Sequence, residues 1–133
     1  MNPQRTQNYT ENQLSKIIFE AALKVHRVLG PGLLESAYEE CLIYELIKSE
    51  LQVVKQKPLP LIYEEVKLDV GYRVDLMVEN KVIIEIKSVD ALKDIHLAQV
   101  LTYLKLSDCK LGLLINFNVN LIKNGFKRVV NNL

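Results

Sequence analysis

The feature that most constrains the fold is a pair of apolar segments, residues 72–78 and 82–87, with charged side chains set among the apolar ones. Successive side chains of a β-strand point to opposite faces, so alternation of this kind is typical of strands. On the first strand we expect Arg73, Asp75 and Met77 to share one face, with Val74, Leu76 and Val78 on the other. The polar residues 79–81 between the two segments predict a hairpin turn.

The length of that turn decides where two acidic side chains lie. If residues 79–81 form a three-residue loop, Val78 pairs with Val82, and Asp75 lies directly across from Glu85. A two-residue loop would instead place Asp75 opposite Ile86 and send the two carboxylates to opposite faces of the sheet.

Two facing carboxylates repel each other and are costly to remove from water, so a positive group is expected beside them. Lys87 is one candidate. A divalent cation is the other, because Mg²⁺ prefers one or two carboxylates together with waters and substrate phosphates. The alternative interpretation is a solvated sheet face that carries an ordinary set of ion pairs.

Composition indicates a single domain over residues 1–133, long enough to bury a core without disulfides. Apolar residues make up 49% and charged residues 25% of the chain, as in ordinary globular proteins. The net charge of +1 provides no overall attraction to nucleic acid, so such binding would need a local patch. The basic residues available for a patch are Lys55, Lys57, Lys123, Lys127 and Arg128.

The two cysteines, Cys41 and Cys109, lie far apart in the sequence and form no metal-binding or redox motif. We expect Cys41 to be a small core residue, and the low cysteine content favours a cytoplasmic location. Residues 1–9 are polar and are expected to form a mobile tail. No apolar run is long enough to cross a membrane, so we expect no membrane association.

Apolar residues recur at helical spacing after a capping box of Thr10 and Gln13, which predicts a helix over residues 11–29. His26 borders its apolar stripe and is expected to be a packed or capping residue. The other expected elements are a helix over 33–50, a short strand over 51–56 that Pro58 and Pro60 interrupt, extended segments at 61–63 and 66–70, a helix over 91–106, a buried strand over 110–117 and a last strand over 126–130.

This order of elements predicts an α/β fold in which one mixed sheet is flanked by helices on both faces. The buried strand that follows the third helix is expected to lie parallel to the second strand of the hairpin.

Two helices carry further polar groups. Glu35 lies in the first turn of the second helix, on the same face as Tyr38. Taken alone, it is explained by a favourable interaction with the helix dipole. On the third helix His96, Gln99 and Tyr103 align at spacings of three and four. Taken alone, Gln99 is better explained as an amide on the helix surface.

Taken together, five blocks of sequence resemble the motifs of the GxxExxY proteins, a small family of the PD-(D/E)xK nuclease superfamily. The blocks are Gly32-x-x-Glu35-x-x-Tyr38, Tyr72-Arg73-Val74-Asp75, Glu85-Ile86-Lys87, residues 98–105 and residues 111–117. The resemblance implies a restriction-endonuclease-like core of order α-β-β-β-α-β, here with an extra N-terminal helix. One departure is Val74, which stands where the superfamily name places proline.

The resemblance also implies functions for individual residues. Asp75 and Glu85 would bind Mg²⁺ or Mn²⁺, with the backbone carbonyl of Ile86 as a further ligand and Glu35 completing the acidic cluster. Lys87 would orient the attacking water or offset charge on the scissile phosphate. Catalysis would then involve Glu35, Asp75, Glu85, Lys87 and Gln99, and the substrate would contact Gln99, Tyr103, Arg73 and Tyr38.

Three hypotheses follow for function. The first is a metal-dependent nuclease acting on nucleic acid, with DNA as the expected substrate. The second is a non-catalytic module with the same fold that binds a partner or nucleic acid, which the near-neutral charge favours. The third is a structural dimer in which Lys87 and Arg73 neutralise the carboxylates. Exposed apolar residues on the first helix are the surface that we consider for a homodimer.

Overall fold

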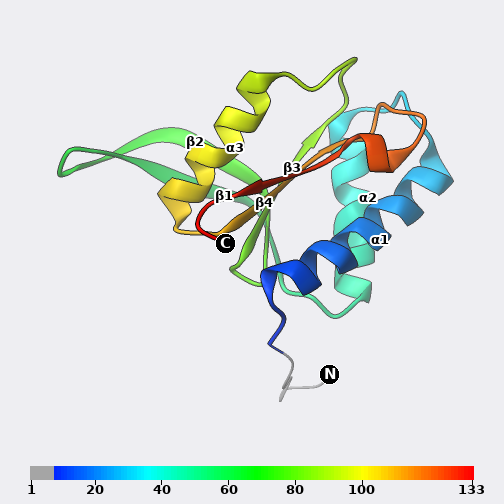
Figure 1. Cartoon of the computed structure of the whole chain (residues 1–133), viewed down its shortest axis with the longest axis horizontal. Helices are drawn as coiled ribbons and strands as arrows, with labels where there is room; N and C mark the ends of the chain where they lie inside the picture. The colour runs from blue at the N-terminus through cyan, green and yellow to red at the C-terminus, as the bar shows by residue number, and fades with distance from the viewer. Residues whose placement is uncertain (1–7) are drawn as a thin grey trace.

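The computed structural model describes residues 8–133, which form a five-stranded mixed sheet between two layers of helices (Figure 1). Helices α1 and α2 cover one face of the sheet, and α3 lies on the other. The strands lie side by side in the order β1-β2-β3-β4-β5. The bounds are α1 Glu11–Leu29, α2 Glu35–Lys48, β1 Val53–Tyr63, β2 Val66–Val78, β3 Val82–Lys87, α3 Asp94–Ser107, β4 Leu111–Asn116, the 3₁₀ turn η1 Ile122–Asn124 and β5 Phe126–Val130.

The predicted fold class is confirmed. Elements α2 to β4 have the expected order α-β-β-β-α-β, preceded by α1 as the extra helix. The last element, β5, adds an antiparallel strand along β4. Strand β4 runs parallel to β3 as predicted, and all six of its residues are buried, as expected for a strand covered on both faces.

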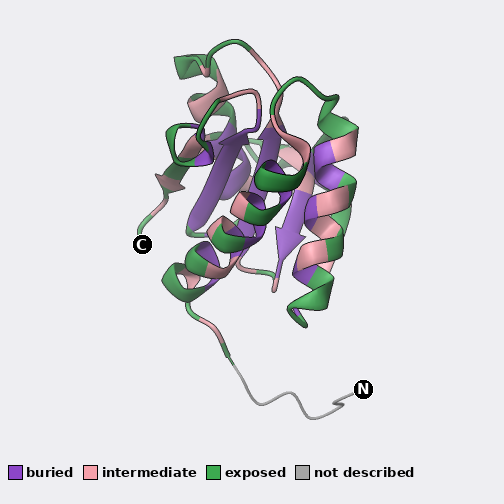
Figure 2. Cartoon of the chain, turned by 90° about the vertical axis from the view of Figure 1, so that its right-hand side faces the viewer, coloured by how far each residue is buried: buried purple, intermediate pink, exposed green. Residues whose placement is uncertain are grey.

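Each face of the sheet has its own apolar core. The strands between the helices are coloured as buried in Figure 2. The larger core joins α1 and α2 to side chains such as Leu76, Ile84 and Ile115. The smaller core joins α3 to side chains such as Met77, Ile83 and Leu114. Alternate residues of β3 and β4 therefore enter different cores, which fixes the register of both strands.

Helix α1 has the predicted bounds and the predicted capping box. The Gln13 N–H donates to Thr10 Oγ1 at 3.1 Å, and the Thr10 N–H donates to Gln13 Oε1 at 2.9 Å. His26 is buried, with Nε2 2.7 Å from the Val119 carbonyl oxygen, as expected for a packed histidine. Helices α2 and α3 both begin later than predicted, and at α3 the Lys93 N–H caps the new start by donating to His96 Nδ1.

The predicted interruption at Pro58 and Pro60 is wrong, because both residues lie inside the single strand β1. Proline cannot donate a hydrogen bond to a neighbouring strand, but β1 is an edge strand and has such a neighbour on one side only. The register shifts between Leu59 and Leu61, around the second proline. Strand β2 also continues through Gly71, whose φ of 80° suits glycine.

The two long strands form a hairpin that extends away from α1 and α2, on the left of Figure 1. The predicted face of Val74 is wrong, because its side chain packs with Met77 in the α3 core, whereas Leu76 lies in the α1–α2 core. The alternation of side chains along β2 breaks opposite Gln56 of β1. Gln56 has a φ of 52° and lies between the pairs Lys55–Leu76 and Lys57–Val74.

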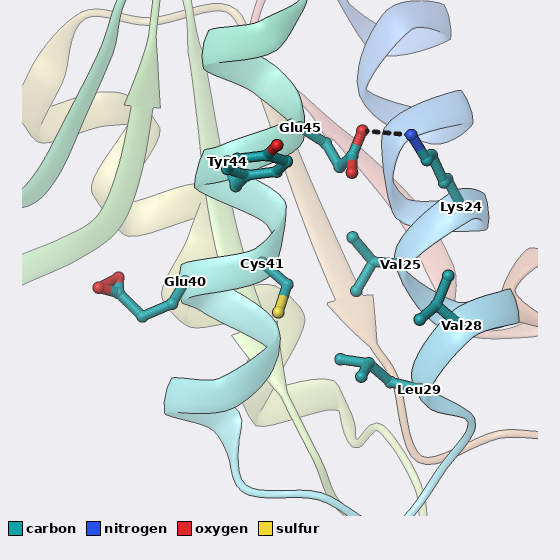
Figure 3. A pocket seen from close by; sticks show the side chains of 8 residues that line it. All are labelled: Lys24, Val25, Val28, Leu29, Glu40, Cys41, Tyr44 and Glu45. Atoms are coloured by element: carbon teal, nitrogen blue, oxygen red, sulfur yellow. Dashed lines mark ion pairs between the residues drawn. The ribbon is translucent and has the colours of Figure 1, made fainter.

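A groove of about 350 Å³ separates α1 from α2, and Cys41 lies on its wall (Figure 3). Cys41 is half-buried against the larger core and is not one of its fully buried members. An ion pair between Lys24 and Glu45, 3.1 Å apart, closes one side of the groove. Val28 on α1 lines this groove and is 75% exposed. It belongs to the surface of the first helix that we consider for a homodimer.

Most of the predicted N-terminal tail, residues 1–7, lies outside the described residues. The two described residues of that tail are held in place, because Lys81 Nζ donates to Asn8 Oδ1 at 2.7 Å and to the Tyr9 carbonyl oxygen at 2.6 Å. Within residues 8–133, no helix has both the length and the apolar character that crossing a membrane requires.

Candidate active site

The site begins where the pairing between β2 and β3 stops. The pairs are Val78–Val82, Met77–Ile83 and Leu76–Ile84, which confirms the three-residue loop over residues 79–81. The next residues in this register are Asp75 and Glu85, and no backbone pair joins them. Strand β3 meanwhile keeps its pairing with β4 up to Lys87 and Asn116.

Two carboxylates replace the backbone hydrogen bonds beyond that point. The Asp75 N–H donates to Glu85 Oε2 at 2.7 Å, and the Ile86 N–H donates to Asp75 Oδ2 at 2.8 Å. Each strand thus lends one backbone donor to the carboxylate of the other strand. The exchange holds both acidic side chains in the opening between β2 and β3, as the predicted register requires.

The electrostatic cost of this arrangement falls mainly on Glu85, which is 5% exposed. Burial, followed by the nearby Asp75 carboxylate, raises the pKa of Glu85 to about 8. Burial also raises the pKa of Asp75, although the Ile86 N–H, the Gln56 amide and the charge of Lys87 oppose the shift. The pair therefore retains a proton near neutral pH unless a further positive charge approaches.

A third buried carboxylate, Glu39 on α2, was not among the predicted site residues. Gln56 Nε2 donates to both of its oxygens, at 3.1 and 3.3 Å, and lies 3.5 Å from Asp75 Oδ1. Burial and then the Asp75 charge raise the pKa of Glu39. Its place one helical turn after Glu35 was the available signal, since residues four apart share a helix face.

Glu35 opens α2, as predicted, but its side chain is exposed. Glu35 Oε2 accepts the Ser88 N–H at 3.3 Å, and Ser88 Oγ donates to the Leu33 carbonyl oxygen at 2.6 Å. These bonds tie the start of α2 to the residue that follows β3. The negative charge of Glu35 is also one of the causes that raise the pKa of Asp75.

Tyr38 has no exposed surface, and its ring stacks on Phe117 with centroids 4.5 Å apart. Its hydroxyl donates to the Gly30 carbonyl oxygen at 2.6 Å and accepts the Leu33 N–H at 3.1 Å. A fully buried side chain with these partners does not fit the predicted contact with substrate. Tyr38 instead closes the loop that leads into α2 and so positions Glu35.

The two basic residues near the carboxylates differ in burial. Lys87 is half-buried and its charge lowers the pKa of both Asp75 and Glu85, whereas Arg73 is exposed. In the part of the chain that the structure describes, neither basic side chain forms an ion pair with either carboxylate. The direct salt bridges that the structural-dimer hypothesis requires are therefore not found there.

The residues predicted on the third helix, Gln99 and Tyr103, lie on α3, which covers the face of the sheet opposite to α1 and α2. Tyr103 is buried, and its pKa is raised by burial first and by the Glu85 charge next. Gln99 is exposed one turn earlier and lines a pocket with Tyr103 and Tyr72. The structure thus places Asp75 next to Glu85 and, through Gln56, next to Glu39, while Glu35 and Gln99 lie at the edges.

Within the described residues, no group of three His, Cys, Asp or Glu side chains is arranged to hold a metal ion by itself. The donor set nevertheless fits Mg²⁺ or Mn²⁺, which take hard oxygen ligands and usually keep several water ligands beside one or two carboxylates. A cation between Asp75 and Glu85 would also relieve the repulsion that contributes to the raised pKa of Glu85.

One of three comparisons with known proteins found a match. Neither the curated proteins nor the solved structures contain a match to this chain. A family model described as the PD-(D/E)XK nuclease superfamily matches residues 12–129, from α1 to β5. The match spans the sheet, the three helices and the paired carboxylates, and the protein is therefore a member of the PD-(D/E)XK nuclease superfamily.

Proposed function

We propose that this protein is a metal-dependent nuclease that hydrolyses phosphodiester bonds, with DNA as the expected substrate. Superfamily membership supports a nuclease-like function in general, and the five motif blocks favour the GxxExxY branch. The observation that carries the proposal is a pair of crossed hydrogen bonds, in which the Asp75 N–H donates to the Glu85 carboxylate and the Ile86 N–H donates to the Asp75 carboxylate. Two carboxylates held together in this way are costly for a fold and useful for binding a cation.

Asp75 and Glu85 would hold the cation, since each commits one oxygen to a backbone N–H. The other oxygen of Asp75 has a contact of only 3.5 Å with Gln56 Nε2, which leaves it able to bind a cation as well. The Ile86 carbonyl is the further ligand that the motif implies, and Glu35 would act from the rim of the acidic cluster. When bound, the cation supplies Lewis-acid chemistry, which polarises a phosphoryl oxygen and lowers the pKa of water. Mg²⁺ and Mn²⁺ are both suitable.

Lys87 would place a positive charge next to the substrate as well as next to the carboxylates. Its charge already lowers the pKa of both carboxylates, and it would stabilise the negative charge that develops on the phosphate during hydrolysis. Arg73 is exposed on β2, two residues before Asp75, and would contact the phosphate backbone. Gln99 and Tyr103 would contact the substrate from α3.

The direct test is to incubate the purified protein with Mg²⁺ or Mn²⁺ and with single-stranded, duplex and branched DNA and RNA. We expect cleavage that requires the metal and is lost in Asp75→Asn. That variant keeps an acceptor for the Ile86 N–H but removes one charge. A wild-type protein that cleaves none of these substrates beyond the level of the variant would contradict the proposal.

A second candidate function is a non-catalytic module that binds a partner or nucleic acid with the same fold. The near-neutral net charge of +1 favours it, because nucleases usually attract their substrate with a basic surface. Calorimetric titration with Mg²⁺, combined with the cleavage assay, separates the two. Metal binding without cleavage of any substrate supports the module, and metal binding with cleavage supports the enzyme.

We keep two further predictions. A homodimer across the α1–α2 groove is compatible with the exposure of Val28, and sedimentation analysis would detect it. A cytoplasmic location is compatible with Cys41 and Cys109, which are both free thiols.

A further inference from the structure

We propose that the pocket between β2 and α3 receives one unpaired nucleobase stacked on Tyr72, so that the neighbouring carboxylates act on single-stranded or frayed nucleic acid. This inference rests on the nuclease function proposed above. It concerns Tyr72 and the form of the substrate, which neither the carboxylate pair nor the family match specifies.

The pocket has the size and composition of a small-ligand site. Its volume is about 460 Å³, within the roughly 300–1,000 Å³ that is usual for such sites. Tyr72 forms its β2 side, and Gln99, Thr102 and Tyr103 contribute from α3. Aromatic surface combined with a few polar groups is what a nucleobase requires, because each base has an apolar face and a hydrogen-bonding edge.

Tyr72 is the available stacking platform. Its side chain is 38% exposed, whereas Tyr103 is 5% exposed. The two rings have centroids 6.0 Å apart and are tilted by 57°, so no base fits between them. A sandwich would need parallel rings about 7 Å apart, because carbon atoms in contact are roughly 3.5–4.0 Å apart. The base must therefore stack on Tyr72 alone, and Tyr103 supports the Tyr72 ring.

The strand holds Tyr72 in place. Tyr72 pairs with Leu59, which is 4% exposed and belongs to the α3 core. A platform anchored in a sheet loses little conformational freedom when a base stacks on it.

Polar groups on α3 face the same pocket. Gln99 and Thr102 are both exposed and lie three residues apart, on one side of the helix. The Gln99 amide offers a donor and an acceptor, and the Thr102 hydroxyl offers both as well. Such groups can bond the edge of a base only when that edge is not already paired with a complementary strand.

The spacing along β2 links the pocket to the carboxylates. Tyr72 lies three residues before Asp75, which corresponds to about 10 Å along an extended strand. Neighbouring nucleotides of one strand can reach across such a distance. In an intact duplex the base would first have to leave its stack, which costs a few kcal/mol that an unpaired strand does not spend.

The test is binding of a fluorescently labelled single strand and of a hairpin duplex to the full chain, in EDTA so that no cleavage occurs. We expect tighter binding of the single strand. Tyr72→Ala should weaken that binding about 5- to 150-fold, the factor that corresponds to one base–aromatic stacking contact. Tyr72→Phe keeps the ring and should bind within about twofold of wild type.

Tyr63→Ala is the matched control, because Tyr63 is also an exposed tyrosine of the hairpin, 63% exposed, and does not line the pocket. We expect it to bind as wild type does. Binding in which Tyr72→Ala equals wild type, in which Tyr63→Ala loses as much, or in which the duplex is preferred would overturn the proposal. Circular dichroism would verify that each variant is folded.

A scan with single abasic sites gives an independent readout. For wild type, removal of the base at one position should weaken binding, and the same abasic strand should cost Tyr72→Ala nothing further. Cleavage assays keep the two proposals apart. Cleavage that is insensitive to Tyr72 and to strand form contradicts the base pocket alone, whereas Tyr72-dependent binding without any cleavage contradicts the nuclease function alone.

Discussion

The two halves of β3 are consecutive in the sequence but have different neighbours in space. Residues 82–84 pair with β2 on one side and with β4 on the other. Residues 85–87 pair with β4 alone, and on the β2 side the backbone donors of Asp75 and Ile86 turn to carboxylates.

The difference shows how a sheet can hold charges without losing its fold. A buried N–H without a partner costs roughly 1–3 kcal/mol, so the end of a ladder must be compensated. Here the carboxylates provide that compensation, and the backbone fixes the carboxylates in return. The first half of β3 is therefore expected to govern stability, and the second half to govern chemistry.

The largest expected effect comes from Glu85→Gln in the second half. Glutamine keeps an acceptor for the Asp75 N–H, so the fold should persist, but the variant loses a charge that a cation needs. We expect Mg²⁺ binding to disappear in calorimetry. Loss of a residue that only hydrogen-bonds to a metal ligand typically lowers activity roughly 10–100-fold. Because Glu85 would be a ligand itself, we expect cleavage to fall by more than that. Wild-type cleavage in this variant would contradict the assignment of Glu85 as a ligand.

A second prediction concerns pH and the metal-free protein. The folded protein holds the Glu85 proton up to about pH 8, whereas the unfolded chain releases it near 4.5. The folded state therefore binds more protons between these values, and the free energy of unfolding falls as pH rises through this range. The pKa shifts of Asp75 and Glu39 have the same direction.

The loss cannot exceed about 1.4 kcal/mol per pH unit for one group. Denaturant unfolding in EDTA at a series of pH values would measure it, with Glu85→Gln as the control that should give a flatter curve. Saturating Mg²⁺ should also flatten the wild-type curve, because the cation favours the charged carboxylates. A stability that is constant or rises between pH 5 and 8 in EDTA, with no difference from the variant, would contradict the electrostatic account of the site.

These halves also show what the sequence could and could not predict. The local pattern left two loop lengths open and predicted that Asp75 and Glu85 meet only with the three-residue loop, which is the alternative that the observed register confirms. The hydrogen bond that Glu39 on α2 accepts from Gln56 on β1 joins two elements of the assembled fold, and no local pattern contains that contact. Val74 lies on the face opposite to the predicted one because the alternation of β2 breaks beside Gln56, whose positive φ lies in the left-handed region.

The sequence did not predict that β1 continues through its prolines, for a similar reason. Pro58 and Pro60 are tolerated because β1 lies at the edge of the sheet, and an edge position is a property of the assembled sheet. The full burial of Tyr38, which does not fit the predicted substrate contact, involves stacking on Phe117, a residue far away in the sequence. Local chemistry was predictable in each case, and burial was not.

The smallest expected effect comes from the first half of β3 and completes the comparison. Ile84 is fully buried in the α1–α2 core and pairs with Leu76 and Leu113. Ile84→Val removes one methylene group and should lower the free energy of unfolding by roughly 0.5–1.5 kcal/mol. Because the residue contributes no charge to the site, Mg²⁺ affinity and cleavage at a temperature well below unfolding should be unchanged. If Ile84→Val instead weakened metal binding as Glu85→Gln does, the two halves of β3 would form one cooperative unit, and the carboxylates would depend on core packing as well as on the exchanged hydrogen bonds.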